Sequence, residues 1–160
     1  MSACFSPARF AAASFALTML LAAAETPAIA ADHAAHHGGV KLSATLNGAN
    51  EVDAKGTAAQ GDPDGSGSFA ARLVPGQGQL CYTLTSASID APTMAHIHSG
   101  AAGVSGPVFV PLTELAAGEH CIAIPADKAT AIVAKPGDYY VNIHNAAFPG
   151  GAVRGQLVKN

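Results

Sequence analysis

The stretch Met94-Ala95-His96-Ile97-His98-Ser99-Gly100 indicates most clearly which secondary structure this chain forms. Successive side chains of a β-strand point to opposite faces, so His96 and His98 share one face while Ala95 and Ile97 occupy the other. The two imidazoles then lie roughly 6.5–7 Å apart along the strand. This alternation predicts a strand with one apolar face toward a core and one face that carries two potential metal ligands.

Short segments with similar patterns, separated by turn-forming Gly, Pro and Asn residues, continue along the chain. One helix is expected over Ala126–Ala134, because Pro125 precedes it and Pro136-Gly137 follows it. About eight strands with at most one helix predict an all-β fold, an antiparallel Greek-key β-sandwich of the immunoglobulin-like or superoxide dismutase-like kind. The expected strands are Val40–Leu46, Ser68–Val74, Gln79–Ser88, Thr93–His98, Pro107–Leu112, Glu119–Ile124, Asp138–His144 and Ala152–Val158.

A third histidine lies in a segment that alternates in the same way. In Asp138–His144, the side chains of Tyr140, Asn142 and His144 fall on one face, and two aliphatic side chains fall on the other. If this strand lies beside the one that contains His96 and His98, the three imidazoles converge. The sequence does not establish that the two strands are neighbours.

Three converging imidazoles would leave a fourth metal position open for water, substrate or another ligand. Copper and zinc both accept imidazole nitrogen, and the sequence does not separate them. The alternative is that His96, His98 and His144 lie on a solvated sheet face or make hydrogen bonds to structural partners.

Residues 1–30 have the three parts of a secretory signal peptide. Arg9 supplies a positive charge, Phe10–Ala24 is an apolar, alanine-rich run, and Ala28-Ile29-Ala30 is a small-x-small cleavage sequence. The alternative is an uncleaved membrane anchor, but a bilayer span needs about 20 apolar residues and this run is shorter. We therefore expect cleavage, a mature protein without membrane attachment, and a periplasmic or secreted location.

Cleavage after Ala30 would expose a histidine-rich leader, residues 31–39. Its new N-terminus, Ala31-Asp32-His33, offers an amine, two amide nitrogens and an imidazole in the planar arrangement that suits Cu(II) or Ni(II), and His36 and His37 could add ligands. The alternative is a solvated tail whose histidines bind nothing specific.

Cysteine usage is consistent with export. Cys4 would leave with the signal peptide, and two cysteines, Cys81 and Cys121, would remain. A pair of cysteines in an exported chain favours one disulfide, with two buried free thiols as the alternative.

Composition excludes several kinds of partner for the predicted domain, residues 40–160. The chain has 8 Lys and Arg against 11 Asp and Glu, a formal net charge of −3. This balance provides no basic surplus for nucleic acid or for an anionic membrane. Neither a G-x-S-x-G nucleophile elbow nor a phosphate-binding glycine loop is present.

Five blocks of the sequence resemble the CHRD (chordin-type) domain family, and they occur in the order typical of that family. The resemblance covers about residues 40–158 and implies a β-sandwich without implying one particular activity. We expect Arg154 to be a structural residue that forms hydrogen bonds or an ion pair, rather than a catalytic residue. The His-x-His strand and its glycine-rich loop are also similar to the copper-binding strand of copper/zinc superoxide dismutases. The five blocks are residues 46–52, 95–100, 106–110, 140–144 and 148–157.

We therefore expect an exported, non-catalytic binding module that binds a transition metal, copper in preference to zinc, through His96, His98 and His144. One alternative is a copper-dependent redox enzyme of the superoxide dismutase type, and another is a metal-free structural or protein-interaction domain. The expected partners are a metal ion and a protein in the same compartment.

Overall fold

The computed structural model describes residues 38–160. The predicted signal peptide, residues 1–30, and the predicted leader ligands Ala31, Asp32, His33, His36 and His37 lie outside the described residues. Within residues 38–160, no helix is long and apolar enough to cross a membrane.

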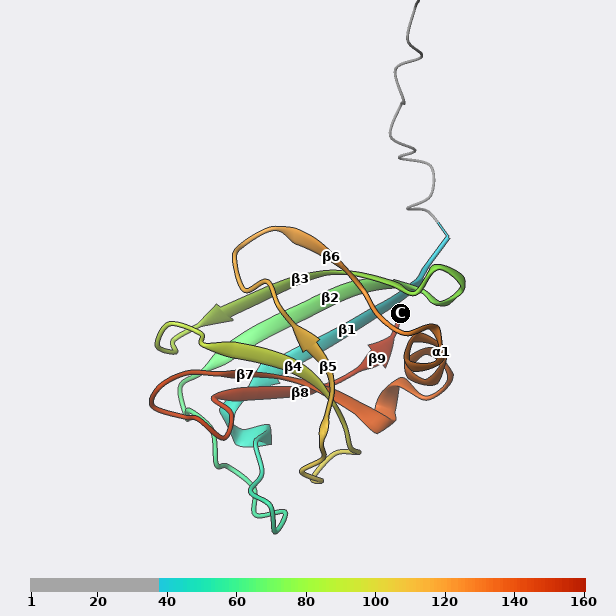
Figure 1. Ribbon diagram of the computed structural model, residues 1–160. Coiled ribbons are helices and arrows are strands. Elements are labelled where there is room, and N and C mark those ends of the chain that lie inside the picture. Colours follow the sequence, from blue (N-terminus) through green and yellow to red (C-terminus); the bar gives the residue numbers. More distant parts are fainter. Residues whose placement is uncertain (1–37) are drawn as a thin grey trace, which may run out of the picture. The chain divides into compact units, whose positions relative to one another are not determined.

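The described residues form nine strands that join antiparallel into one sheet, in the order β5-β4-β7-β8-β1-β2-β3-β6, with β9 beside β1. Strands β3 and β4 follow one another in the chain but lie apart in the sheet, as do β5 and β6, so the connections are of the Greek-key type. Figure 1 shows the sheet folded over into a nearly closed sandwich. The strands are β1 (Val40–Asn47), β2 (Ser66–Val74), β3 (Gln79–Ala87), β4 (Met94–Ser99), β5 (Val108–Leu112), β6 (Glu119–Ala123), β7 (Tyr139–His144), β8 (Val153–Gln156) and β9 (Val158–Lys159).

The only α-helix among these residues, α1 (Ala126–Ala134), has the predicted bounds. It buries Ala129 and Ile132 and contacts the short turn between β2 and β3. The predicted antiparallel β-sandwich is confirmed. Three single-turn 3-10 helices complete the described structure, at Gly48–Asn50, Pro75–Gln77 and Pro136–Asp138.

The core forms from the alternating apolar side chains of both layers. In β1 every second side chain, from Leu42 to Leu46, is buried, because one face of the strand meets the interior. Strand β4 contributes Ala95 and Ile97 to the same core. The opposite face of β4 is therefore left for His96 and His98.

The C-terminal strand differs from its prediction. The segment expected as one strand, Ala152–Val158, is two strands, β8 and β9, separated by Leu157. Leu157 donates its backbone N–H to Tyr139 O, so its donor is directed to β7, while β9 pairs with β1. Strand β8 pairs with both β7 and β1, so the break lies where the pairing with β7 ends and only the pairing with β1 continues.

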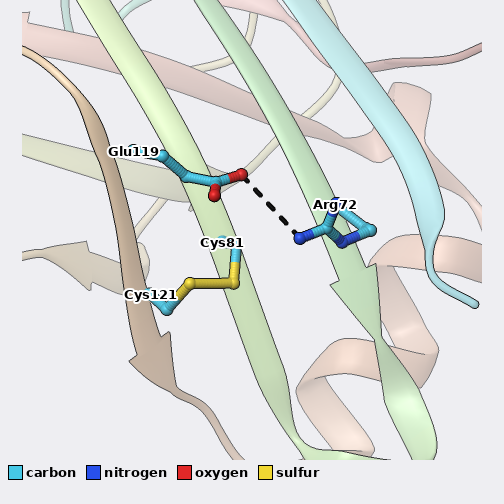
Figure 2. Close-up of polar contacts among 4 residues, drawn as sticks. All are labelled: Arg72, Cys81, Glu119 and Cys121. Atoms are coloured by element: carbon cyan, nitrogen blue, oxygen red, sulfur yellow. Dashed lines mark ion pairs between the residues drawn. A yellow bond between two sulfur atoms is a disulfide. The ribbon is translucent and has the colours of Figure 1, made fainter. Parts of the chain in front are cut away.

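A disulfide joins the edge strand β6 to β3. Cys81 and Cys121 are directly opposite each other in the antiparallel register, and their sulfur atoms are bonded. The predicted disulfide is confirmed. Figure 2 shows it beside an ion pair in which Arg72 Nη2 lies 3.8 Å from Glu119 Oε1. Exposed ion pairs of this kind contribute little, so the covalent bond is the stronger tie on this edge.

Candidate metal centre

The pairing of β4 with β7 brings the three predicted histidines together. His96 lies opposite Asn142, and His144 follows two residues later on the same face of β7. The candidate ligand atoms of His96, His98 and His144 all lie within 4.8 Å of one another. The two strands are therefore neighbours, which the sequence did not establish. The three histidines form a group that could hold a metal ion.

An irregularity in β5 lies next to this group. The register between β4 and β5 shifts between Ile97 and His98, so that Phe109 is left as an extra residue opposite β4. Such bulges change the direction of neighbouring side chains and are common beside functional sites. The chain between the two strands, residues 100–107, then folds back over His98.

Backbone carbonyls determine which ring nitrogens are free. His98 Nδ1 lies 2.9 Å from Gly106 O, and His144 Nδ1 lies 3.0 Å from Pro149 O. Because a carbonyl oxygen only accepts hydrogen bonds, both Nδ1 atoms carry the proton and donate it. Each neutral ring therefore keeps its lone pair on Nε2, the form that binds a metal.

The His98 Nε2 lone pair is buried and has no hydrogen-bond partner among residues 38–160. His98 is 8% exposed and His144 is 7% exposed, so water has little access to either ring. An unpartnered polar atom in such a place is unfavourable. A metal ion bound at His98 Nε2 would remove that cost.

His96 and His144 form the tightest pair in the group. His96 Nδ1 lies 3.2 Å from His144 Nε2. Bonds of about 2.0–2.1 Å in a tetrahedral zinc site place ligand atoms about 3.3–3.4 Å apart. This pair already has the required spacing, whereas the full 4.8 Å spread is wider. Binding of one ion by all three rings therefore requires a small inward rotation of a side chain.

All three histidines have pKa values below the usual value for the residue. Burial is the main cause for His96, and the nearby rings of His144 and His98 lower its pKa further. Burial also lowers the pKa of His98 and of His144, partly offset in each by the hydrogen bond to a backbone carbonyl. The neutral, metal-binding form of each ring therefore persists to a lower pH than the neutral form of a free imidazole does.

Behind the histidines, three side chains form a stack. The ring of Tyr140 lies parallel to that of His98, with centroids 4.8 Å apart, and the guanidinium carbon of Arg154 lies 3.3 Å from the centre of the Tyr140 ring. Arg154 Nη2 donates to the carbonyls of Ala101 and Val104. Arg154 is thus the structural residue expected from the sequence, and it holds the glycine-rich loop over the site.

Two residues of the site were missed by the sequence reasoning. Asn142 Oδ1 lies 3.1 Å from His144 Nε2, and Glu51, only 4% exposed, lies next to the Asn142 side chain, with its Oε1 atom unpartnered among residues 38–160. Burial raises the pKa of Glu51 to about 7, although Arg154 and Asn142 act to lower it. Asn142 shares its strand face with His144, which was a usable signal, whereas nothing in the local sequence linked Glu51 to the histidines.

An apolar cleft of about 400 Å³ lies elsewhere, between the two edge strands β5 and β6. Its one charged residue, Lys128, donates from Nζ to Phe109 O at 2.6 Å. None of the three histidines lines this cleft. The cleft therefore has no ligand set comparable to the histidine group.

Comparison with known proteins gives one match. A family model described as the CHRD domain matches residues 42–157, which is most of the chain. No curated protein and no solved structure matches it.

Proposed function

The chain belongs to the CHRD domain family, and on that premise we propose that it is an exported, non-catalytic module that binds a transition metal through His96, His98 and His144. Membership in this family favours a binding module over an enzyme. The three histidines supply the chemistry that such a module needs for a metal ion.

The observation that carries this proposal is the buried, unpartnered Nε2 atom of His98. Within the described part of the chain it has no hydrogen-bond partner, and its ring is oriented by a hydrogen bond from Nδ1 to Gly106 O. Metal-binding histidines commonly have their second nitrogen engaged in this way, which fixes the tautomer and the ring orientation. His144 is held in the same manner by Pro149 O.

Copper is the preferred metal, and zinc is the alternative. Affinities of nitrogen sites for divalent metals rise to a maximum at Cu(II) and fall again at Zn(II). The predicted leader adds a second reason, because Ala31-Asp32-His33 would supply planar nitrogen ligands suited to Cu(II) after cleavage. Storage, buffering or delivery of the metal are the roles that fit a module without a reaction of its own.

A redox enzyme of the superoxide dismutase type is less well supported. Such a site needs positive charge that guides an anionic substrate to the metal. Arg154 is the cation stacked next to the site, but it is only 2% exposed and its Nη2 atom is engaged by two carbonyls. It is therefore poorly placed to attract an anion from solution.

The disulfide supports the proposed location. Disulfides persist in oxidising compartments such as the periplasm and the extracellular space, and are rare in the cytosol. The bond between Cys81 and Cys121 therefore favours an extracytoplasmic location, in agreement with the predicted signal peptide.

Isothermal titration with Cu(II) and Zn(II) tests the proposal. The full chain is exported from its own predicted signal. It is compared with a variant in which His33, His36 and His37 are replaced by Ala, which we call leader-deficient because it lacks the leader histidines. We expect a saturable site with submicromolar Kd that survives loss of the leader histidines. The combined change His96→Ala and His144→Ala should weaken this site at least 100-fold.

His120→Ala is the matched control, because His120 is a strand histidine whose Nε2 bonds to Ala116 O in a different part of the sheet. It should bind metal as the unchanged protein does. The proposal is wrong if the leader-deficient variant has no site tighter than micromolar, or if its affinity is unaffected by loss of His96 and His144.

A further inference from the structure

We infer that Asn142 is a fourth ligand of the metal site, through its amide oxygen Oδ1, and that Glu51 is the positioning residue that turns this oxygen toward the histidines. The inference rests on the proposed three-histidine metal site and extends it by a ligand and by the residue that orients that ligand. It concerns the position that three imidazoles leave open.

The first step is the state of His144 Nε2. Since His144 Nδ1 donates its proton to Pro149 O, the neutral ring has only a lone pair at Nε2. The atom 3.1 Å from this lone pair is Asn142 Oδ1, which is also an acceptor. Two acceptors that face each other at this distance repel, unless a cation lies between them.

The second step is the orientation of the Asn142 amide. Rotation of the amide by 180° would exchange oxygen for nitrogen and remove the repulsion. With Oδ1 against His144 Nε2, the Nδ2 end of the amide is the end left for the neighbouring Glu51 carboxylate, which only accepts hydrogen bonds. Only Nδ2 can donate, so Nδ2 faces Glu51 and Oδ1 faces the histidines.

Glu51 is itself closely packed in this position. It is buried against Gly151, whose backbone has φ +135°, and a Cβ atom at that position would collide with the Glu51 carboxyl group. A residue with a side chain would therefore push Glu51 away from Asn142. The glycine permits the close packing that fixes the amide.

The third step is the spacing of the ligand atoms. His96 Nδ1 and Asn142 Oδ1 lie 3.2 Å and 3.1 Å from His144 Nε2. Both distances are close to the separation of ligands around a common ion with bonds of about 2.0–2.1 Å. With His98 Nε2 the set becomes three nitrogens and one oxygen. Zinc accepts oxygen as well as nitrogen ligands, and amide oxygen is an established ligand of calcium in proteins.

Zinc titration and the visible spectrum of the Co(II)-loaded protein test this inference on the leader-deficient chain. Asn142→Ala should weaken Zn(II) binding at least tenfold and should change the Co(II) absorption bands, because a ligand is lost. Asn142→Asp should bind at least as tightly as the unchanged chain, since it retains an oxygen at the same position. If Asn142→Ala does not fold, Asn142→Asp carries the test.

Two variants of Glu51 distinguish its role in orienting the Asn142 amide from the space that its side chain fills. Glu51→Gln keeps an acceptor for Asn142 Nδ2, so Zn(II) affinity and the Co(II) spectrum should stay close to those of the unchanged protein. Glu51→Leu fills similar space without an acceptor, so the amide is released and both properties should shift toward those of Asn142→Ala. A merely structural Glu51 would leave the Co(II) spectrum of the folded Leu variant unchanged.

The inference is overturned if folded Asn142→Ala binds Zn(II) with unchanged affinity and an unchanged Co(II) spectrum, or if Asn142→Asp binds more weakly than the unchanged protein. These results would leave the three-histidine site in place. An unchanged protein that binds neither Zn(II) nor Co(II) would instead refute the metal site itself, and the fourth ligand with it.

Discussion

At the scale of single residues, the chemistry of the site depends on which side-chain atoms already form hydrogen bonds. Backbone carbonyls take the protons of His98 Nδ1 and His144 Nδ1, and this leaves two Nε2 lone pairs. Burial favours neutral rings, since the pKa of each of these histidines is lowered. Glu51 is buried in the same network, and burial raises its pKa from 4.5 to about 7.

Replacement of Glu51 by Gln should change how the stability of the metal-free protein depends on pH. In the folded chain the Glu51 carboxyl group holds its proton more tightly than in the unfolded chain, so its stabilising contribution is complete below about pH 4.5 and is lost as the pH rises through about 7. The shift corresponds to about 3 kcal/mol. Glu51→Gln should lack this loss and should be the more stable protein at pH 8.

Urea unfolding of both proteins in the presence of a chelator, from pH 4 to pH 8, measures this effect. The difference between the two curves isolates Glu51, because the histidines titrate in both proteins. Parallel stability profiles over this range would contradict the raised pKa.

Among the elements, the β4–β7 pair and the loop after β4 assemble the site. The pairing places His96 opposite Asn142, and the loop that follows β4 supplies the carbonyl of Gly106 to His98. Tyr140 and Arg154 fix the same loop, through a hydrogen bond from Gly106 N–H to the Tyr140 hydroxyl and through the two carbonyls that Arg154 binds. The loop therefore forms a wall beside the site, and its Gly106 carbonyl orients the His98 ring.

Gly106→Ala should damage both this wall and the metal site. A Cβ atom on Gly106 would collide with the backbone carbonyl of Ser99, which cannot move without disturbing β4. We expect a loss of about 2–3 kcal/mol in the free energy of unfolding. We also expect roughly tenfold weaker Zn(II) binding, because His98 loses its carbonyl partner.

Gly103→Ala is the matched control in the same loop. A Cβ atom there meets nothing within 4 Å, but the backbone has φ +76°, so the cost is conformational and about 1 kcal/mol. Its Zn(II) affinity should be unchanged. Chemical denaturation and metal titration of the two variants check the prediction, and equal metal affinities in both would argue against the wall.

At the scale of the whole molecule, one antiparallel sheet forms the core and also carries the polar site. The inner faces of β4 and β7 pack Ile97 and Val141 into the core, while their other faces carry the three histidines. The disulfide ties the edge strand β6 to β3. Because the ligands come from two strands 48 residues apart in sequence, the metal site exists only in the folded protein.

A metal that binds only the folded state should therefore raise thermal stability. At a free Zn(II) concentration 100-fold above Kd, linkage predicts a gain of about 2.7 kcal/mol, or an increase in Tm of about 10 °C. The leader-deficient protein should show this increase in calorimetry, and a chelator should reverse it. An equal increase in the variant with His96→Ala and His144→Ala would show that the effect arises elsewhere.

Most of the fold was predictable because strand formation is read from local patterns. Alternation in β4 and β7 was enough to separate the core side chains from the histidines, since the period of two follows from backbone geometry alone. Pro125 and Pro136 marked the bounds of α1 for a similarly local reason. The break at Leu157 was missed, because it depends on where the pairing with β7 ends, which the local pattern does not contain.

The sequence by itself determined the strands, the faces on which His96, His98 and His144 lie, and the family. Tertiary structure alone decided that β4 and β7 are neighbours, that Gly106 and Pro149 orient two rings, and that Glu51 meets Asn142. The physical reason is the range of the interactions. Side-chain alternation is set within a few residues, whereas register, burial and hydrogen bonding at the site join segments that are far apart in the chain and meet only when the sheet closes.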